Sequence, residues 1–242
     1  MKVDYYHFGG QCPLSHASIA LLKEFSDTFD LTTHDVRNDE AAAKAQNMFY
    51  PSLMVVSGRR YFAPLSRAFL KRLAAGEFPK EKPYIVEHGT TEKVGKLAPL
   101  SEENIGLAGH CTGRKDLSKM RFLKEQQGEV YGVLNVENGE LLGGAEALPS
   151  LSVPYPIPKS PRYAFLTCVY PAEEKIDAKA APLRGLEQEL AKRFDKLYAV
   201  SANIGTFPNG DLEWFLKQGY KDEGVVAIEE EYATLHLVSK TL

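Results

Sequence analysis

The sequence predicts an α/β protein made of two successive domains, one over residues 1–82 and one over residues 93–242. Segments with strand-like and helix-like apolar spacing alternate along the whole chain. The length of 242 residues exceeds the roughly 100–150 residues of a common single domain. Between the two ranges, Phe78–Pro83 reads FPKEKP, and two prolines with three charges are typical of a domain boundary. Because this boundary is short, we expect the domains to pack against each other.

The composition is that of a globular protein, with 44% hydrophobic and 25% charged residues. The net charge of −3 and the mixing of basic with acidic residues argue against nucleic-acid binding. Asp4 and His7 stand where a secretory signal would be apolar, and no segment approaches the ~20 apolar residues of a membrane helix. The sequence therefore predicts a cytoplasmic protein without a membrane partner.

The chain has three cysteines, Cys12, Cys111 and Cys168. They are widely spaced and odd in number, which argues against a disulfide framework. No pair of Cys or His has the short spacing of structural zinc sites, so no metal site is predicted.

In the first domain, residues 2–8 predict a strand that ends at Gly9-Gly10. The apolar spacing from Leu14 to Phe25 predicts a helix opened by Pro13, which places Cys12 at the strand-to-helix junction. The same reasoning predicts strands at 31–36, 53–56 and 60–62 and helices at 38–47 and 65–73. The predicted order is β-α-β-α-β-β-α.

This order, with Cys12 opening the first helix and Pro51 just before the third strand, resembles the thioredoxin fold over about a third of the chain. In that family the helix opens with Cys-x-x-Cys, whereas here Ser15 replaces the second cysteine. The resemblance implies that Pro51 is a cis-proline beside the thiol. A monothiol role for Cys12 and a purely structural role both remain open. A thiol at a helix start faces unpaired N–H groups, which predicts a lowered pKa for Cys12.

The second domain is predicted to combine an antiparallel meander with later helices and strands. Asn138-Gly139 between two apolar runs is a strong hairpin signal. Residues 163–170 form a dense apolar run that predicts a buried central strand. The remaining predictions are helices at 101–108, 116–124, 183–194 and 211–217 and strands at 130–136, 140–148, 197–202, 225–228 and 234–238.

This order of elements resembles the GNAT superfamily of N-acetyltransferases over about 150 residues. Asn203 and the segment Asp211–Tyr220, DLEWFLKQGY, resemble the strand, short helix and Gly-aromatic signature of that superfamily. Shorter matches resemble its YoaP-like branch, and they are Cys111-Thr112-Gly113, Phe122-Leu123-Lys124, Val130-Tyr131-Gly132-Val133 and Thr167-Cys168-Val169.

The resemblance implies acetyl-CoA as the cofactor, with its pantetheine arm against the central strand. The implied cofactor-binding residues are Leu166, Thr167, Cys168, Val169, Tyr170, Lys175, Lys179, Asn203 and Phe215. The stretch Glu173–Pro182 departs from the family, because it holds no glycine where a phosphate loop is expected, and its acidic residues would repel a phosphate. Lys175 and Lys179 could compensate for these charges. Phe215 stands where many members have a proton-donating tyrosine.

The leading hypothesis is an N-acetyltransferase that transfers acetyl from acetyl-CoA to a small-molecule or peptide amine. Tyr170 would donate the proton, and Cys168 and Cys12 complete the catalytic candidates. The alternatives are a non-catalytic GNAT-fold binding or regulatory protein and a monothiol thioredoxin-like redox protein that uses Cys12. A homodimer and a shared site between the Cys12 and Tyr170 regions are both left open.

Overall fold

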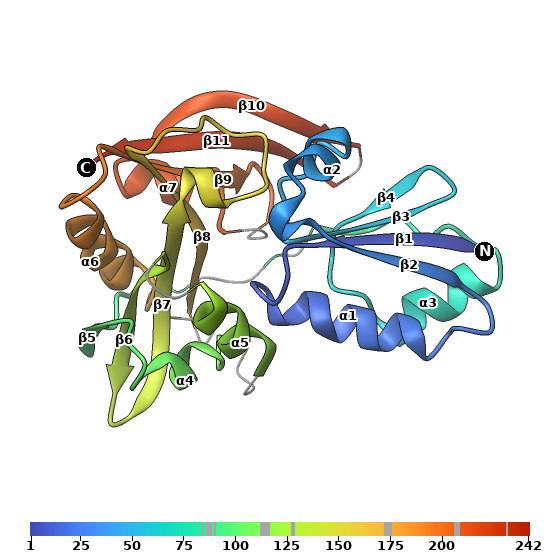
Figure 1. The fold of residues 1–242 in the computed structure, drawn as a ribbon, viewed down its shortest axis with the longest axis horizontal. Coiled ribbons are helices and arrows are strands. Elements are labelled where there is room, and N and C mark those ends of the chain that lie inside the picture. The colour runs from blue at the N-terminus through green and yellow to red at the C-terminus, as the bar shows by residue number, and fades with distance from the viewer. Residues whose placement is uncertain are drawn as a thin grey trace.

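The β-strands form two sheets in the computed structural model, which describes residues 1–83, 85, 89, 91–111, 117–126, 129–171, 176–205, 209–230 and 232–242 (Figure 1). Within these residues, one sheet has four strands in the order β2-β1-β3-β4. The other has seven, in the order β10-β11-β9-β8-β7-β6-β5. The predicted mixed α/β class is confirmed, while the domain limits at residues 82 and 93 stay a prediction.

The smaller sheet belongs to the first third of the chain, as predicted. Its elements are β1 (Lys2–His7), α1 (Pro13–Lys23), β2 (Asp30–Asp35), η1 (Val36–Asn38), α2 (Glu40–Ala45), β3 (Ser52–Val56), β4 (Arg59–Tyr61) and α3 (Arg67–Ala74). β1 pairs parallel to β2 and antiparallel to β3, and β3 pairs antiparallel to β4. Helices α1 and α3 lie on the same side of this sheet (Figure 1). The order β-α-β-α-β-β-α is confirmed, whereas the thioredoxin-like description stays a prediction.

The larger sheet contains the predicted meander and central strand. Its elements are β5 (Lys96–Pro99), α4 (Ile105–Ala108), α5 (Leu117–Glu125), β6 (Tyr131–Glu137), β7 (Glu140–Pro149), η2 (Ser150–Ser152), β8 (Tyr163–Pro171), α6 (Ala180–Leu190), β9 (Lys196–Ala202), α7 (Leu212–Lys217), β10 (Lys221–Glu229) and β11 (Ala233–Thr241). Asn138 and Gly139 both have positive φ between β6 and β7, as the Asn-Gly hairpin signal predicts.

Three predictions for this region were inaccurate. The helix predicted over 183–194 spans Ala180–Leu190 instead. Strand β5 was not predicted, because Lys96–Pro99 is a short, mostly exposed edge strand without an apolar pattern. The helix predicted over 101–108 begins only at Ile105, because the Asn104 side chain accepts the Ser101 N–H and forms a turn there instead. Asp116, the predicted start of the next helix, lies outside the described residues.

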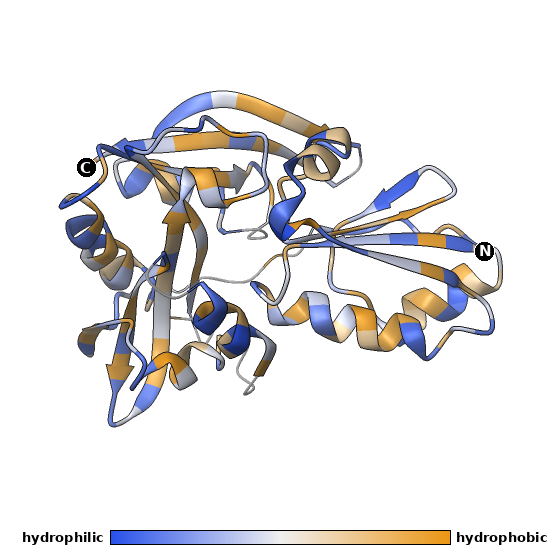
Figure 2. Cartoon of the chain, viewed as in Figure 1, coloured by the Kyte–Doolittle hydropathy of each residue, from blue (hydrophilic) through white to orange (hydrophobic). Residues whose placement is uncertain are grey.

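The two parts of the chain contact each other through an apolar cluster that includes residues of both. The ring of Phe8, at the end of β1, lies 5.3 Å from the ring of Phe122 on α5 and 5.7 Å from that of Tyr155. A Cβ atom on Gly10 would lie 2.4 Å from the Ser118 carbonyl oxygen, so only glycine allows this close approach. Figure 2 shows hydrophobic and hydrophilic bands alternating on the helices, as expected for helices that cover a sheet with one face.

Among the described helices, none is long and apolar enough to cross a membrane.

We predict that the two sheets unfold together. Phe8→Ala should lower the free energy of unfolding by about 3–5 kcal/mol, because it opens a cavity in the shared cluster. Trp214, the only tryptophan, lies on α7 beside the larger sheet. Its fluorescence transition in denaturant should therefore shift together with the far-UV circular dichroism. A Trp214 transition that stays in place in this variant would contradict the prediction.

Candidate functional site

The candidate site lies where the central strand β8 separates from its neighbour β9. β8 and β9 pair in parallel only from Tyr163 to Phe165, although β8 continues to Pro171. On its other side β8 pairs with β7, with a register shift that leaves Thr167 as an extra residue. Within the described part of the chain, the β9-facing edge of β8 after Phe165 has no strand partner. An open backbone edge inside a sheet can bind an extended ligand.

Two side-chain amides lie at this open edge. Asn209 Nδ2 is 3.4 Å from the carbonyl oxygens of both Leu166 on β8 and Val200 on β9, so it bridges the separating strands. Gln11, which follows β1 in the smaller sheet, donates from Nε2 to the Thr167 carbonyl at 2.8 Å. Gln11 and Asn209 are only 3% and 4% exposed. Among the described residues, no partner is found for Gln11 Oε1 or Asn209 Oδ1.

The N-terminus of α6, where the resemblance implies a phosphate site, is bound by a carboxylate of this chain. The N–H groups of Lys179 and Ala180 donate to Asp177 Oδ1 at 3.1 and 3.0 Å. The indole N–H of Trp214 donates to Asp177 Oδ2 at 3.3 Å. Asp177 thus supplies the negative charge that a helix N-terminus favours.

Lys179 does not point its charge toward an open phosphate site. Its side chain is buried, and its Nζ lies 3.8 Å from the centre of the Trp214 ring. Burial lowers the pKa of Lys179 to about 8, although Asp177 and Asp211 act in the opposite direction. The second predicted lysine, Lys175, lies outside the described residues.

A buried ion pair forms the polar centre on the other face of β8. Lys119 on α5 and Glu146 on β7 are 0% and 1% exposed, and Lys119 Nζ lies 3.0 Å from Glu146 Oε2. The Tyr170 hydroxyl donates to Glu146 Oε1 at 2.9 Å, and Lys119 Nζ lies 4.7 Å from the Tyr170 ring centre. Gly144 allows this arrangement, since a Cβ there would be 2.6 Å from the Tyr170 hydroxyl.

The pKa values in this centre follow from its burial and its charges. Burial raises the pKa of Tyr170 well above its ordinary value, and Glu146 adds to that effect. Burial alone would lower the pKa of Lys119, but Cys111, Cys168 and Glu146 around it raise that pKa well above its usual range. Tyr170 is therefore protonated and Lys119 charged at neutral pH.

The three free cysteines gather around this centre. Cys168 faces Glu146 across the β7–β8 ladder, and Cys12 and Cys111 are close enough to Cys168 to influence its pKa. Burial raises the pKa of Cys168 and also that of Cys12, whose helix-start N–H bonds from Leu14 and Ser15 only partly offset it. The prediction of a lowered pKa for Cys12 was wrong, because burial against the apolar cluster outweighs the helix start.

The structure brings Cys12 and Tyr170 to the same junction, because both are close enough to Lys119 and Cys168 to interact with them electrostatically. Two other predicted residues lie elsewhere. Asn203 pairs with Thr234 on β11, accepting its N–H at 2.8 Å, and Phe215 is fully buried in the core beside α6. No described group of three or more Cys, His, Asp or Glu residues is placed to hold a metal ion.

Sequence reasoning missed Gln11, Lys119, Glu146 and Asn209. Nothing in the local sequence singles them out, because their partners are distant along the chain. For Gln11 and Thr167 the separation is 156 residues. For Asp177 a signal existed, since an Asp shortly before an Ala-Ala-Pro helix start is typical of capping.

No protein-family model matches the sequence, and no curated protein matches it either. Solved structures of GNAT-family acetyltransferases match about 60% of the chain. An aminoglycoside 6'-acetyltransferase type Ii matches with 18% identity and a TM-score of 0.48, over 60% of this chain and 96% of its own. An aminoglycoside 6'-N-acetyltransferase in complex with coenzyme A matches with 18% identity and a TM-score of 0.46, over the same shares. A ribosomal-protein-alanine N-acetyltransferase from Brucella melitensis matches with 14% identity and a TM-score of 0.44, over 61% and 99%. These values are too low to assign an activity to this chain.

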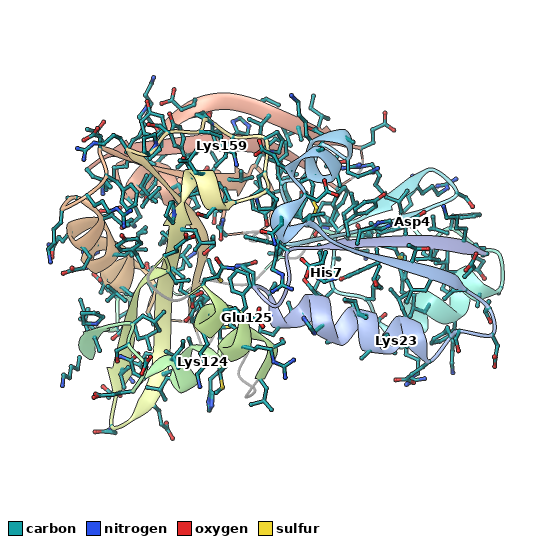
Figure 3. The ribbon with its side chains drawn as sticks, viewed as in Figure 1. Asp4, His7, Lys23, Lys124, Glu125 and Lys159 are labelled. Carbon is teal, nitrogen blue, oxygen red and sulfur yellow. The ribbon has the colours of Figure 1, made fainter. Side chains whose placement is uncertain are left out.

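We predict that Lys119→Met lowers the free energy of unfolding by about 3–5 kcal/mol, because Glu146 would be left as an unpaired buried charge. The double variant Lys119→Met/Glu146→Leu should recover most of this loss. Chemical denaturation at pH 7 measures both effects. Lys124→Met is the matched control, since Lys124 lies on the same helix and is exposed (Figure 3). A loss in Lys119→Met as small as that of the control would contradict the prediction.

We also predict that Cys12 is alkylated slowly at neutral pH. In a Cys111→Ser/Cys168→Ser variant, the rate with iodoacetamide should rise with a midpoint above the ordinary thiol value of ~8.5, because burial raises the pKa of Cys12. Adding Lys119→Met should raise the midpoint further, since Lys119 favours the thiolate. A midpoint below pH 7 would restore the activated-thiol hypothesis.

Proposed function

We propose that this chain is an acyltransferase that moves an acyl group from a pantetheine thioester, of which acetyl-CoA is the common example, to an amine. The observation that carries the proposal is the early separation of β8 from β9, which leaves the edge at Leu166–Tyr170 open. The side chains of Cys168 and Tyr170 lie on the opposite face from Leu166 and Val169, which pack toward α6. The segment Leu166–Tyr170 therefore carries both the open backbone edge and, through Cys168 and Tyr170, side chains of the polar centre.

In the proposed reaction, the carbon–sulfur bond of the thioester breaks and a carbon–nitrogen bond to the amine forms. The amine loses one proton, which water can accept, and the leaving thiolate gains one. Tyr170 is the proposed proton donor, because it is protonated at neutral pH and lies near the end of β8. Its hydroxyl, which donates to Glu146 Oε1, would turn to the leaving thiolate. Lys119 beside its ring stabilises the tyrosinate that the transfer leaves.

The pKa values favour direct attack of the amine over an acyl-cysteine intermediate. Burial raises the pKa of Cys168 and of Cys12, so neither thiol is a ready nucleophile at neutral pH. In this proposal the two thiols line the site, and positioning of the amine supplies much of the rate.

An acidic hollow at the junction supports an amine as the acceptor. It has a volume of about 530 Å³ and lies beside Phe8. Three carboxylates line it, from Glu40, Glu125 and Glu129, against the single guanidinium of Arg37. Glu125 lies on α5 at the side facing the smaller sheet (Figure 3). Arg37 pairs with Glu125, and Lys159 Nζ lies 3.9 Å from Glu40, so Glu129 leaves one carboxylate charge in excess, which would attract a protonated amine.

A non-catalytic binding protein is the second candidate. It is favoured by the way in which Asn209 and Asp177 already occupy the β8–β9 gap and the α6 N-terminus. Calorimetry with S-acetyl-pantetheine and with acetyl-CoA separates the two candidates. Heat of binding, followed by release of free thiol in the presence of an amine, is expected for the acyltransferase. No binding of either thioester at millimolar concentration would refute it.

We predict that Tyr170→Phe lowers kcat by about 10²-fold or more, because it removes the proton donor. Affinity for the thioester should stay the same, since the ring remains over Lys119. Tyr163→Phe is the matched control, because Tyr163 lies on the paired end of the same strand. Equal kcat values for the two variants would assign Tyr170 a structural role only.

A further inference from the structure

We infer that the thioester donor is held through the amides of its pantetheine arm, by Gln11 and Asn209, and not through a diphosphate at α6. A pantetheine thioester that lacks the nucleotide is then a full substrate. This inference rests on the proposed acyl transfer and names the part of the donor that the chain recognises.

The α6 N-terminus has little capacity left for a diphosphate. A helix offers the N–H groups of its first residues to an anion. At α6, the N–H groups of Lys179 and Ala180 already donate to Asp177, and Pro182 has no N–H to offer. The carboxylate of Asp177 would also repel a second anion at this place.

Asp177 is held in place from several directions. Its backbone N–H donates to the Thr91 carbonyl at 3.0 Å, and its carbonyl accepts the Lys93 N–H at 2.9 Å. The Trp214 indole holds its other carboxylate oxygen. A diphosphate on the α6 N–H groups would have to displace the Asp177 carboxylate from Lys179, Ala180 and Trp214, while the backbone of Asp177 keeps it close by.

The part of the proposed site that would hold the pantetheine arm offers hydrogen-bond acceptors instead. Gln11 Oε1 and Asn209 Oδ1 are buried polar atoms for which the described residues provide no partner. Each side chain is oriented by its own NH₂ group, which donates to one of two successive β8 carbonyls, those of Thr167 and Leu166. A buried acceptor without a donor is unfavourable, and a ligand that brings N–H groups relieves it. The pantetheine arm carries two amide N–H groups.

Gln11 lies in the turn between β1 and α1, whereas the open strand belongs to the larger sheet. The close contact of Gly10 with Ser118 on α5 positions this turn, so that the Gln11 side chain reaches the Thr167 carbonyl on β8. The first part of the chain is thereby a part of the donor site and not an independent appendage.

The test measures binding of S-acetyl-pantetheine, S-acetyl-4'-phosphopantetheine and acetyl-CoA to the full chain by calorimetry, with acyl transfer as a second readout. The three dissociation constants should agree within about threefold. Acetyl-CoA bound about 100-fold more tightly than S-acetyl-pantetheine would overturn the inference and leave the proposed acyl transfer intact. No binding of any of the three would refute the proposed function itself.

Two variants test the contact to the pantetheine arm and the contact to the diphosphate separately. Gln11→Leu should weaken all three ligands by a similar factor of about ten, because it removes a contact to the arm. Asp177→Asn should strengthen acetyl-CoA alone, because it removes the negative charge and keeps an acceptor for α6. Gln46→Leu, in the same part of the chain, is the control for Gln11, and circular dichroism checks the fold of each variant. A Gln11→Leu variant with unchanged affinities would overturn the assigned role of Gln11.

Discussion

The parallel pairing of β8 with β9 ends at Phe165, and the arrangement of the site follows from this early end. Backbone groups inside a protein need hydrogen-bond partners, so each group on the β9-facing edge of β8 beyond that point must find one elsewhere. Gln11 and Asn209 satisfy two of the carbonyls. The groups left over form the open edge on which the proposed donor arm would lie. The register shift at Thr167 in the β7–β8 ladder places Tyr170 on the face of β8 that carries the buried ion pair.

The first part of the chain completes this centre. Helix α5 and the turn between β1 and α1 lie on the face of β8 that carries Cys168 and Tyr170, and Phe8 packs against Phe122 beside the buried Lys119–Glu146 pair. In such surroundings the charges of the pair act strongly on their neighbours, since the effective dielectric constant is low. The protonation of the tyrosine and of the thiols therefore depends on how the two sheets dock.

Much of the fold could be predicted from local patterns, but little of the site could. The order of strands and helices follows from apolar spacing, and the Asn138-Gly139 hairpin follows from turn chemistry. Contacts between distant residues decide the rest. Asn203 fits the motif by position, yet the structure pairs it with β11 and places Asn209 in the gap. Likewise, the helix start favours a thiolate at Cys12, but burial, which only the tertiary structure reveals, decides its pKa.

The most direct measurement is a crystal structure of this chain with S-acetonyl-CoA, a stable analogue of the thioester. The account predicts a pantetheine arm along Leu166–Tyr170, with Gln11 and Asn209 as its acceptors. Asp177 should still accept the Lys179 and Ala180 N–H groups, and the diphosphate should lie away from α6. An Asp177 carboxylate displaced by a diphosphate on the α6 N–H groups, or an analogue bound away from β8, would contradict the account.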